Sequence, residues 1–298
     1  MIKKINFFHS LIFFNICIFI SSINYLNDNN LIVLCLFLIL TVGISHGSLD
    51  NLKGKILLRS RNIQSISIFY IGYIILSILV ILFWMLFPSL LLTMFLLVAS
   101  YHFGKEDSDF IHKYKNYKIE ILYFLKGSSI ITAPLLFRKE ETIEIFDFLN
   151  FEISNIFLLE SSILILLLII SFVATLLLSS KKNYELKLLL LMDYLSILML
   201  NYFLNPILAF TIYFCFLHSI RHSFKLSNEL NKKNFIKGFK EFLIKAMPLT
   251  ILTAILFLIS LFFLNNYYFL DNAISKVIFI GLASLTFPHI LLEYFLEK

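Results

Sequence analysis

Long apolar runs separated by short polar breaks make up most of this chain. A helix that crosses a lipid bilayer needs about 20 consecutive apolar residues. Ten runs approach that length: 5–25, 31–49, 63–87, 88–103, 119–137, 156–179, 186–204, 206–222, 243–264 and 273–294. Turn-forming residues such as Asn205-Pro206 occupy the breaks. The pattern predicts an all-α, polytopic integral membrane helix bundle of about 8–10 transmembrane helices, with ten preferred. We expect a single transmembrane domain over residues 1–298.

Two of these runs need comment. The run at 119–137 is the weakest because Lys126-Gly127-Ser128-Ser129 interrupts it, so eight or nine spans with a re-entrant piece would also fit. The N-terminal run at 5–25 is long for the core of a signal peptide and lacks a small-residue cleavage site. We expect it to stay in the protein as the first helix.

Composition supports a membrane protein and excludes other classes. Hydrophobic residues make up 59% of the chain and charged residues only 15%, with a mean hydropathy of +0.88. A soluble domain is about half apolar and a quarter charged. The net charge of +6 does not indicate a nucleic-acid partner, because the Lys and Arg residues are scattered through short loops. Cys17, Cys35 and Cys215 lie in apolar runs without CxxC spacing, which argues against disulfides and a zinc ribbon.

The distribution of loop charge predicts the orientation. If the N-terminus is inside, most of the 25 Lys and Arg residues fall in inward segments, whereas the outward loop at 138–155 is mainly acidic. Basic loops face the cytoplasm. We therefore expect both termini to be cytoplasmic, the number of spans to be even, and the protein to lie in the cell (inner) membrane as a multi-pass protein.

Four short clusters hold five of the seven histidines, at the same end of four of the runs. They occupy residues 43–50, 101–104, 218–222 and 287–289. In the predicted orientation each histidine lies about 12–15 residues into its helix, or roughly 18–23 Å at 1.5 Å per residue. All five thus reach a common depth in the cytoplasmic half of the membrane. An ionisable side chain there is a functional-site candidate.

The residue types in these clusters favour a metal site. His218 and His222 are four residues apart, so a helix presents both on one face, where they can bind one metal ion. Ser219 stands where a zinc protease would have its general-base glutamate, which removes the argument for hydrolysis. Neutral imidazole suits Fe, Zn, Cu or Ni. With His46 and His102, four ligands would leave two of six octahedral positions open for oxygen chemistry on ferrous iron.

Three further residues are candidates for the surroundings of the metal. Asp50 follows His46 by four residues and could fix an imidazole tautomer, which we prefer, or bind the metal directly. His289 could orient a ligand, line a cavity, or hydrogen-bond between helices. Tyr101 could line a cavity, although packing against lipid is the commoner role for such a residue.

For other polar residues we expect structural roles. Asp193 is an intramembrane carboxylate that could line a cavity or pair with Lys126 or Asn201, and we favour the pairing. The remaining residues are expected to make interhelical hydrogen bonds (His9 and His112) or to lie at the membrane interface (Arg221, Glu106 and Asp107).

Together the clusters resemble the Brp/Blh family of bacterial and archaeal membrane β-carotene 15,15′-dioxygenases. The resemblance rests on Gly-x-x-His-Gly-Ser-Leu-Asp at 43–50, Tyr-His-Phe-Gly at 101–104, His-Ser-x-Arg-His at 218–222 and Phe-Pro-His at 287–289. The motifs occur in the family's order over nearly the whole chain. Ser48 stands where alanine is frequent and Asn51 where a further histidine often follows, so Asn51 is given no role.

This resemblance implies a ferrous centre, Fe(2+), held by His46, His102, His218 and His222. It also implies that O2 cleaves the central double bond of β-carotene into two molecules of all-trans-retinal, which would supply chromophore to a microbial rhodopsin. The substrate is a hydrocarbon, and an intramembrane site could receive it laterally from the bilayer. No dinucleotide or P-loop motif is present, which fits a reaction without an organic cosubstrate.

Two other classes use the same residues. An integral haem protein could bind its iron between two histidines, although axial pairs usually come from facing helices and His218 and His222 share one. A transporter could relay protons or bind a transition metal through membrane histidines. Internal repeats and broken helices near the midplane would favour the transporter, and the sequence contains no convincing repeat. A desaturase would have closely spaced His-His pairs, which are missing.

Overall fold

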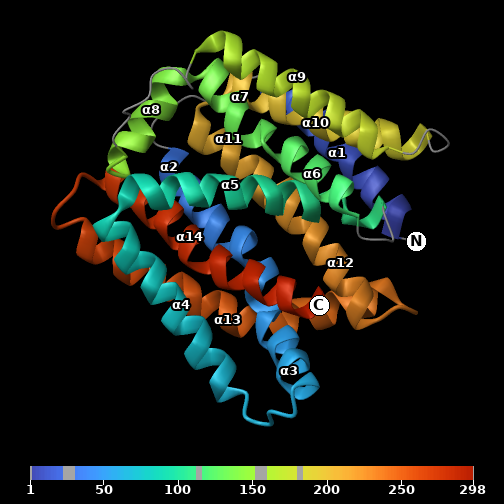
Figure 1. Cartoon of the computed structure of the whole chain (residues 1–298), viewed down its shortest axis with the longest axis vertical. Helices are drawn as coiled ribbons and strands as arrows, with labels where there is room; N and C mark the ends of the chain where they lie inside the picture. Colours follow the sequence, from blue (N-terminus) through green and yellow to red (C-terminus); the bar gives the residue numbers. More distant parts are fainter. Residues whose placement is uncertain (1, 23–30, 112–115, 152–159, 180–183, 298) are drawn as a thin grey trace.

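The computed structural model describes residues 2–22, 31–111, 116–151, 160–179 and 184–297, and within these ranges the chain is helical, with no strand (Figure 1). The uninterrupted long helices are α1 (Ile2–Ser21), α4 (Ser67–Leu86), α5 (Pro88–Glu106), α9 (Ser161–Leu178), α10 (Tyr184–Phe203), α13 (Phe235–Leu264) and α14 (Leu270–Glu297). The short elements between them include η3 (Asp109–Ile111) and α8 (Lys139–Phe148).

Three further spans change helix type or bend along their length. The first contains α2 (Leu31–Leu38), the π-helical η1 (Ile39–Gly43), the 3₁₀-helical η2 (Ile44–Leu49) and α3 (Asp50–Ser60). The second joins α6 (Tyr117–Gly127) to α7 (Ser129–Phe137). The third contains α11 (Pro206–Ile212), the π-helical η5 (Tyr213–Ser219) and α12 (Ile220–Leu230). Such irregular turns within helices are frequent at functional sites.

Nine helical stretches of the described chain are long and apolar enough to cross a membrane. This confirms the all-α polytopic bundle and the expected range of spans. The weak run at 119–137 is one of the nine, as Tyr117–Phe137. The expected span at 88–103 is present as the 19-residue helix α5 but is not among the nine, because polar and charged residues fill its last two turns. The preferred number of ten spans is therefore not reached. The cytoplasmic location of both termini stays a prediction.

Helix starts follow local chemistry. Pro88 opens α5 and Pro206 opens α11, where the missing backbone N–H of proline costs nothing. The side chain of Asn205 accepts a hydrogen bond from the backbone N–H of Leu208 at 2.8 Å and caps α11. Asn234 caps α13 in the same way. The expected break at 27–30 lies outside the described residues.

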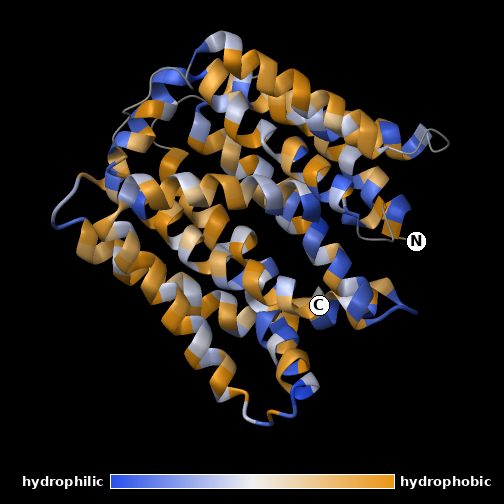
Figure 2. Cartoon of the chain, viewed as in Figure 1, coloured by the Kyte–Doolittle hydropathy of each residue, from blue (hydrophilic) through white to orange (hydrophobic). Residues whose placement is uncertain are grey.

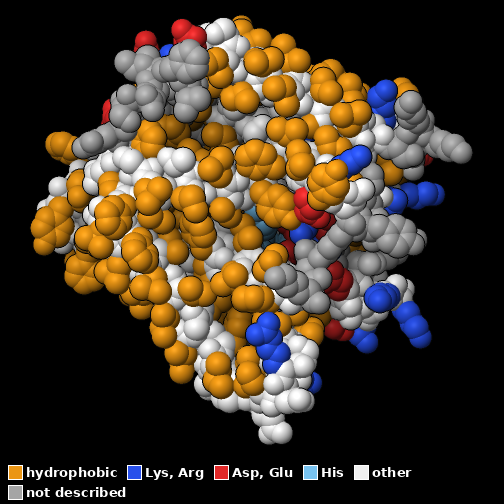
Figure 3. Space-filling view, viewed as in Figure 1, with side chains coloured by type: hydrophobic (Ala, Val, Ile, Leu, Met, Phe, Trp, Pro, Cys, Tyr) orange, Lys and Arg blue, Asp and Glu red, His pale blue; other side chains and the backbone are white. Residues whose placement is uncertain are grey.

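Apolar residues make up most of the helices, and polar residues gather at helix ends and connections (Figure 2). Trp84 is the one buried residue of the described helix α4, whose other side chains are exposed or half-exposed. The space-filling view of one face likewise shows mainly apolar side chains (Figure 3). An exposed apolar surface of this extent is what lipid requires and water does not tolerate.

Two glycines allow the backbones of α5 and α6 to come into close contact. A Cβ atom on Gly104 of α5 would overlap with the backbone carbonyl of Tyr123, and one on Gly127 of α6 would overlap with the carbonyl of Ser100. Small residues let membrane helices approach until their backbones touch. The Lys126-Gly127-Ser128-Ser129 interruption that weakens the hydropathy of this span therefore contains a residue that its packing requires. The contact also fixes the end of α5, which carries His102.

Candidate metal centre

Five histidines from four helical segments meet inside the bundle. They are His46 on η2, His102 on α5, His218 on η5, His222 on α12 and His289 on α14. Each is buried, with at most 8% of its surface exposed. Ring centroids of neighbouring members lie 5.2 Å (His46 and His218), 5.3 Å (His102 and His289) and 6.1 Å (His222 and His289) apart. The sequence clusters are thus brought together at one point.

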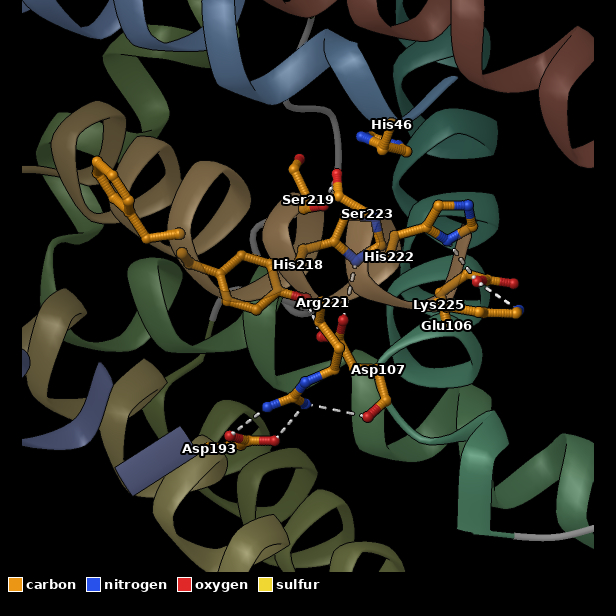
Figure 4. Close-up of polar contacts among 12 residues, drawn as sticks. His46, Glu106, Asp107, Asp193, His218, Ser219, Arg221, His222, Ser223 and Lys225 are labelled. Carbon is orange, nitrogen blue, oxygen red and sulfur yellow. Dashed lines mark hydrogen bonds and ion pairs between the residues drawn. The ribbon is translucent and has the colours of Figure 1, made fainter. Parts of the chain in front are cut away.

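In three of the rings Nδ1 donates to a buried carboxylate. The pairs are His218 with Oδ1 of Asp107 at 2.9 Å, His222 with Oε2 of Glu106 at 2.7 Å, and His289 with Oδ2 of Asp50 at 2.8 Å. His46 donates from Nδ1 to the carbonyl oxygen of Gly43 at 2.6 Å. Carboxylate and carbonyl oxygens accept, so Nδ1 carries a proton, and in the neutral imidazole Nε2 then keeps its lone pair. Figure 4 shows the pairs of Asp107 and Glu106.

The freed Nε2 atoms are what a metal ion would bind. Nε2 of His218, of His222 and of His289 is buried and has no hydrogen-bond partner. Buried polar atoms without partners are costly and rare. One nitrogen from each of His46, His102 and His289 also lies within 4.8 Å of the others. A set of imidazoles backed by carboxylates is the usual surrounding of a histidine-bound metal, and these residues fit one.

Glu106 and Asp107 take part in this centre, contrary to the expectation that they lie at the membrane interface. They are 4% and 2% exposed. Although burial raises the pKa of Asp107, His218 and two buried cations lower it overall, well below its usual range. Asp107 is therefore a carboxylate that accepts from His218. The sequence does contain a signal for this role. The two acids follow His102 by one helical turn, so they lie close to a histidine of a predicted membrane helix.

Arg221 is likewise buried, 2% exposed, and the interface expectation for it is wrong. Its guanidinium makes two hydrogen bonds to Asp193, at 2.6 and 3.0 Å, and one to the backbone carbonyl of Asp107 at 3.1 Å (Figure 4). A further bond joins Arg221 to Ser10 of α1 at 2.7 Å. The expected pairing role of Asp193 is confirmed, but its partner is Arg221. The pair anchors the segment that holds both acids.

The irregular turns shape the centre. The carbonyl of Gly43, at the end of the π-helical η1, accepts from His46 and also from Ser219 Oγ at 2.9 Å. A Cβ atom on Gly43 would lie 2.7 Å from the ring of Phe214, which stacks on His218. Only glycine therefore fits here without displacing a neighbour of the centre. Gly47, on the other side of His46, faces open space.

The structure places the other candidate residues as follows. Asp50 contacts His289 and accepts a hydrogen bond from the hydroxyl of Tyr73 at 3.0 Å. Tyr101 is not brought into contact with the five histidines, since its hydroxyl donates to Glu120 and lies near Lys105. His9 bonds the carbonyl of Phe216, which confirms its structural role. His112 lies outside the described residues.

An apolar cavity adjoins the histidines. Its empty space, including the part open to the outside, is about 720 Å³. Its walls include Phe103, Phe210 and Tyr213. The ring of Phe103 packs edge-on against His218, with centroids 4.8 Å apart. On the face drawn in Figure 3, a histidine is visible between apolar side chains, close to acidic ones. The centre thus borders an apolar chamber within the membrane region.

Comparisons with known proteins agree with this arrangement. A relative from the uncultured marine bacterium 66A03, named β-carotene 15,15′-dioxygenase, is 27% identical over 278 residues, covering 88% of this chain and 93% of its own. No solved structure matches. The sequence model of the family described as β-carotene 15,15′-dioxygenase matches residues 37–297, a range that contains all five histidines of the centre. The chain therefore belongs to the β-carotene 15,15′-dioxygenase family.

Proposed function

We propose that this protein cleaves β-carotene at its central 15,15′ double bond with O2, giving two molecules of all-trans-retinal. The observation that carries the proposal is the set of buried Nε2 atoms without partners, gathered at one point beside an apolar cavity. Membership of the family and the name of the bacterial relative support the reaction type.

For the metal we propose Fe(2+), with His46, His102, His218 and His222 as ligands. His289 is a fifth candidate, because its carboxylate partner and unpaired Nε2 match those of His218 and His222. Imidazole ligands with open positions suit ferrous iron, which would supply the capacity to bind and activate O2. Asp50, Glu106 and the backbone carbonyl of Gly43 would hold their histidines in the tautomer that binds.

The residues of the chain would perform the remaining tasks. The cavity would accept the polyene from the bilayer, and its aromatic walls, with Phe103 between cavity and His218, would hold the central bond next to the metal. Burial of the centre would exclude water from the reacting groups. We place the protein in the cell membrane, where it would supply retinal to a microbial rhodopsin.

Expression in a bacterium that accumulates β-carotene tests the reaction. Cells with the wild-type protein should lose their orange colour and contain retinal, which chromatography identifies. His46→Ala, His102→Ala, His218→Ala and His222→Ala should abolish cleavage while the protein still inserts into the membrane. His9→Ala is the matched control, because His9 is a membrane histidine outside the centre, and it should keep activity. Wild-type cells that stay orange and contain no retinal would refute the proposal.

Metal analysis tests the cofactor. Purified wild-type protein should contain iron and show no Soret band, and a strong chelator should remove both iron and activity until ferrous iron is added back. The iron content of His289→Ala decides whether this residue binds directly: loss of iron indicates a ligand, and retained iron indicates an orienting role.

A further inference from the structure

Tyr213 lies between the cavity and the histidine centre. The residue lines the cavity, and only 2% of its surface is exposed. Its hydroxyl donates a hydrogen bond to Oδ2 of Asp107 at 2.6 Å. The other oxygen of the same carboxylate accepts from Nδ1 of His218 at 2.9 Å. Two consecutive hydrogen bonds therefore connect the wall of the cavity to a proposed metal ligand.

The π-helix makes this arrangement possible. Tyr213 and His218 are five residues apart on η5, and a π-helix pairs residues i and i+5, which brings them onto one face. In an α-helix, with 3.6 residues per turn, the two side chains would point in different directions. Their rings lie 6.4 Å apart and are tilted by only 32°. Both side chains thus reach Asp107 from the same side.

The same arrangement occurs a second time in the centre. The hydroxyl of Tyr73 donates to Oδ2 of Asp50, which in turn accepts from Nδ1 of His289. A neutral hydroxyl fixes the orientation of a carboxylate and leaves its negative charge in place. A carboxylate that is held in this way orients the imidazole and increases its basicity as a ligand. Because the arrangement occurs twice, we infer that each tyrosine hydroxyl holds the carboxylate that orients a histidine of the centre.

We propose that Tyr213 is a positioning residue, which holds Asp107 in line with His218. When a carotenoid fills the cavity and displaces Tyr213, the displacement reaches His218 through Asp107. The inference rests on the proposed function, since it assumes a metal at the histidines and a polyene in the cavity. It adds a role for a residue that touches the cavity but not the metal.

Purified holoenzyme carrying Tyr213→Phe tests this role, because phenylalanine keeps the cavity wall and removes the hydrogen bond. Three quantities are measured: iron affinity by competition with a chelator, kcat and KM for β-carotene, and the visible spectrum of the cobalt(II)-substituted protein with and without β-carotene. We expect iron affinity and kcat to fall about tenfold, the lower end of what loss of an outer-shell partner costs. KM should stay within about twofold, and the spectral change on adding β-carotene should shrink.

Tyr194→Phe is the matched control. Tyr194 is also buried, and its hydroxyl donates to the carbonyl of Leu168, away from the histidines. If Tyr213→Phe and Tyr194→Phe behave alike in iron affinity, kcat and spectrum, Tyr213 has no positioning role. A raised KM with unchanged iron affinity would also overturn the proposal, because Tyr213 would then be cavity wall alone. Wild-type protein that neither binds iron nor cleaves β-carotene would instead refute the proposed function.

Discussion

Nδ1 of His222 lies 2.7 Å from Oε2 of Glu106, although 116 residues separate the two in the chain. Their contact joins α12 to the end of α5 at a point where both side chains are almost fully buried. The same carboxylate also accepts a hydrogen bond from Lys225 at 3.1 Å. Removing one partner of a buried charge leaves that charge uncompensated, which is strongly destabilising. The relationship therefore ties the histidine centre to the packing of the helices around it.

Replacing Glu106 with glutamine should weaken metal binding. The amide oxygen can still accept from Nδ1 of His222, but the negative charge that makes the imidazole a stronger ligand is lost. We expect iron affinity to fall by about 10–100-fold, with a similar loss of activity. Competition with a chelator in detergent measures the affinity. Glu144→Gln, on the exposed side of α8, removes the same charge away from the centre and should leave iron affinity unchanged.

Gly43→Ala should impair the centre, whereas Gly47→Ala should not. The new Cβ at position 43 would lie 2.7 Å from the ring of Phe214 and push it against His218, on which it stacks. At position 47 the Cβ meets open space. We expect Gly43→Ala to lose activity about tenfold or more, the scale of a small misplacement near the chemistry. Retinal yield per membrane-inserted protein is the measure, and equal yields from the two variants would contradict this reading.

The fold and the histidines could be predicted from the sequence because their signals are local. Apolar runs of membrane length identify helices without knowledge of their partners, and imidazole in such a run is exceptional by itself. The common depth of His46, His102, His218 and His222 favoured a single site, but only the folded structure shows that their helices meet. Hydropathy alone does not give the count of spans, because the polar end of α5 contains Glu106, which contacts His222 in the folded protein.

The carboxylates were harder to predict because their roles depend on contacts between distant segments. Glu106, Asp107 and Arg221 lie at the ends of apolar runs, where charged residues usually face the membrane interface. Only the folded structure brings Asp107 to His218 and Arg221 to Asp193. The π-helical turns were equally invisible, because no residue type specifies them; they arise where packing displaces the backbone from the regular helix.

Gly104→Ala should destabilise the protein through the contact between α5 and α6. The added Cβ would overlap with the backbone carbonyl of Tyr123, which cannot rotate away as a side chain could. Overpacking of this kind costs about 1–3 kcal/mol and sometimes more. Thermal unfolding in detergent should show a lower midpoint for Gly104→Ala than for Gly72→Ala, whose Cβ meets nothing within 4 Å. Equal midpoints would mean that the helices can separate without loss.

Arg221→Met should destabilise the protein strongly, and Asp193→Leu in the same chain should restore part of the loss. Removing Arg221 alone leaves the buried carboxylate of Asp193 without its partner, which typically costs about 3–5 kcal/mol. Removing both charges takes away that penalty. Unfolding midpoints of the two single variants and the double variant measure the coupling between the residues. If the effects of the single changes simply add, the pair does not act as a unit.

Iron affinity should stay reduced even in the double variant. The hydrogen bond from Arg221 to the backbone carbonyl of Asp107 is still missing there, so Asp107 is held less firmly against His218.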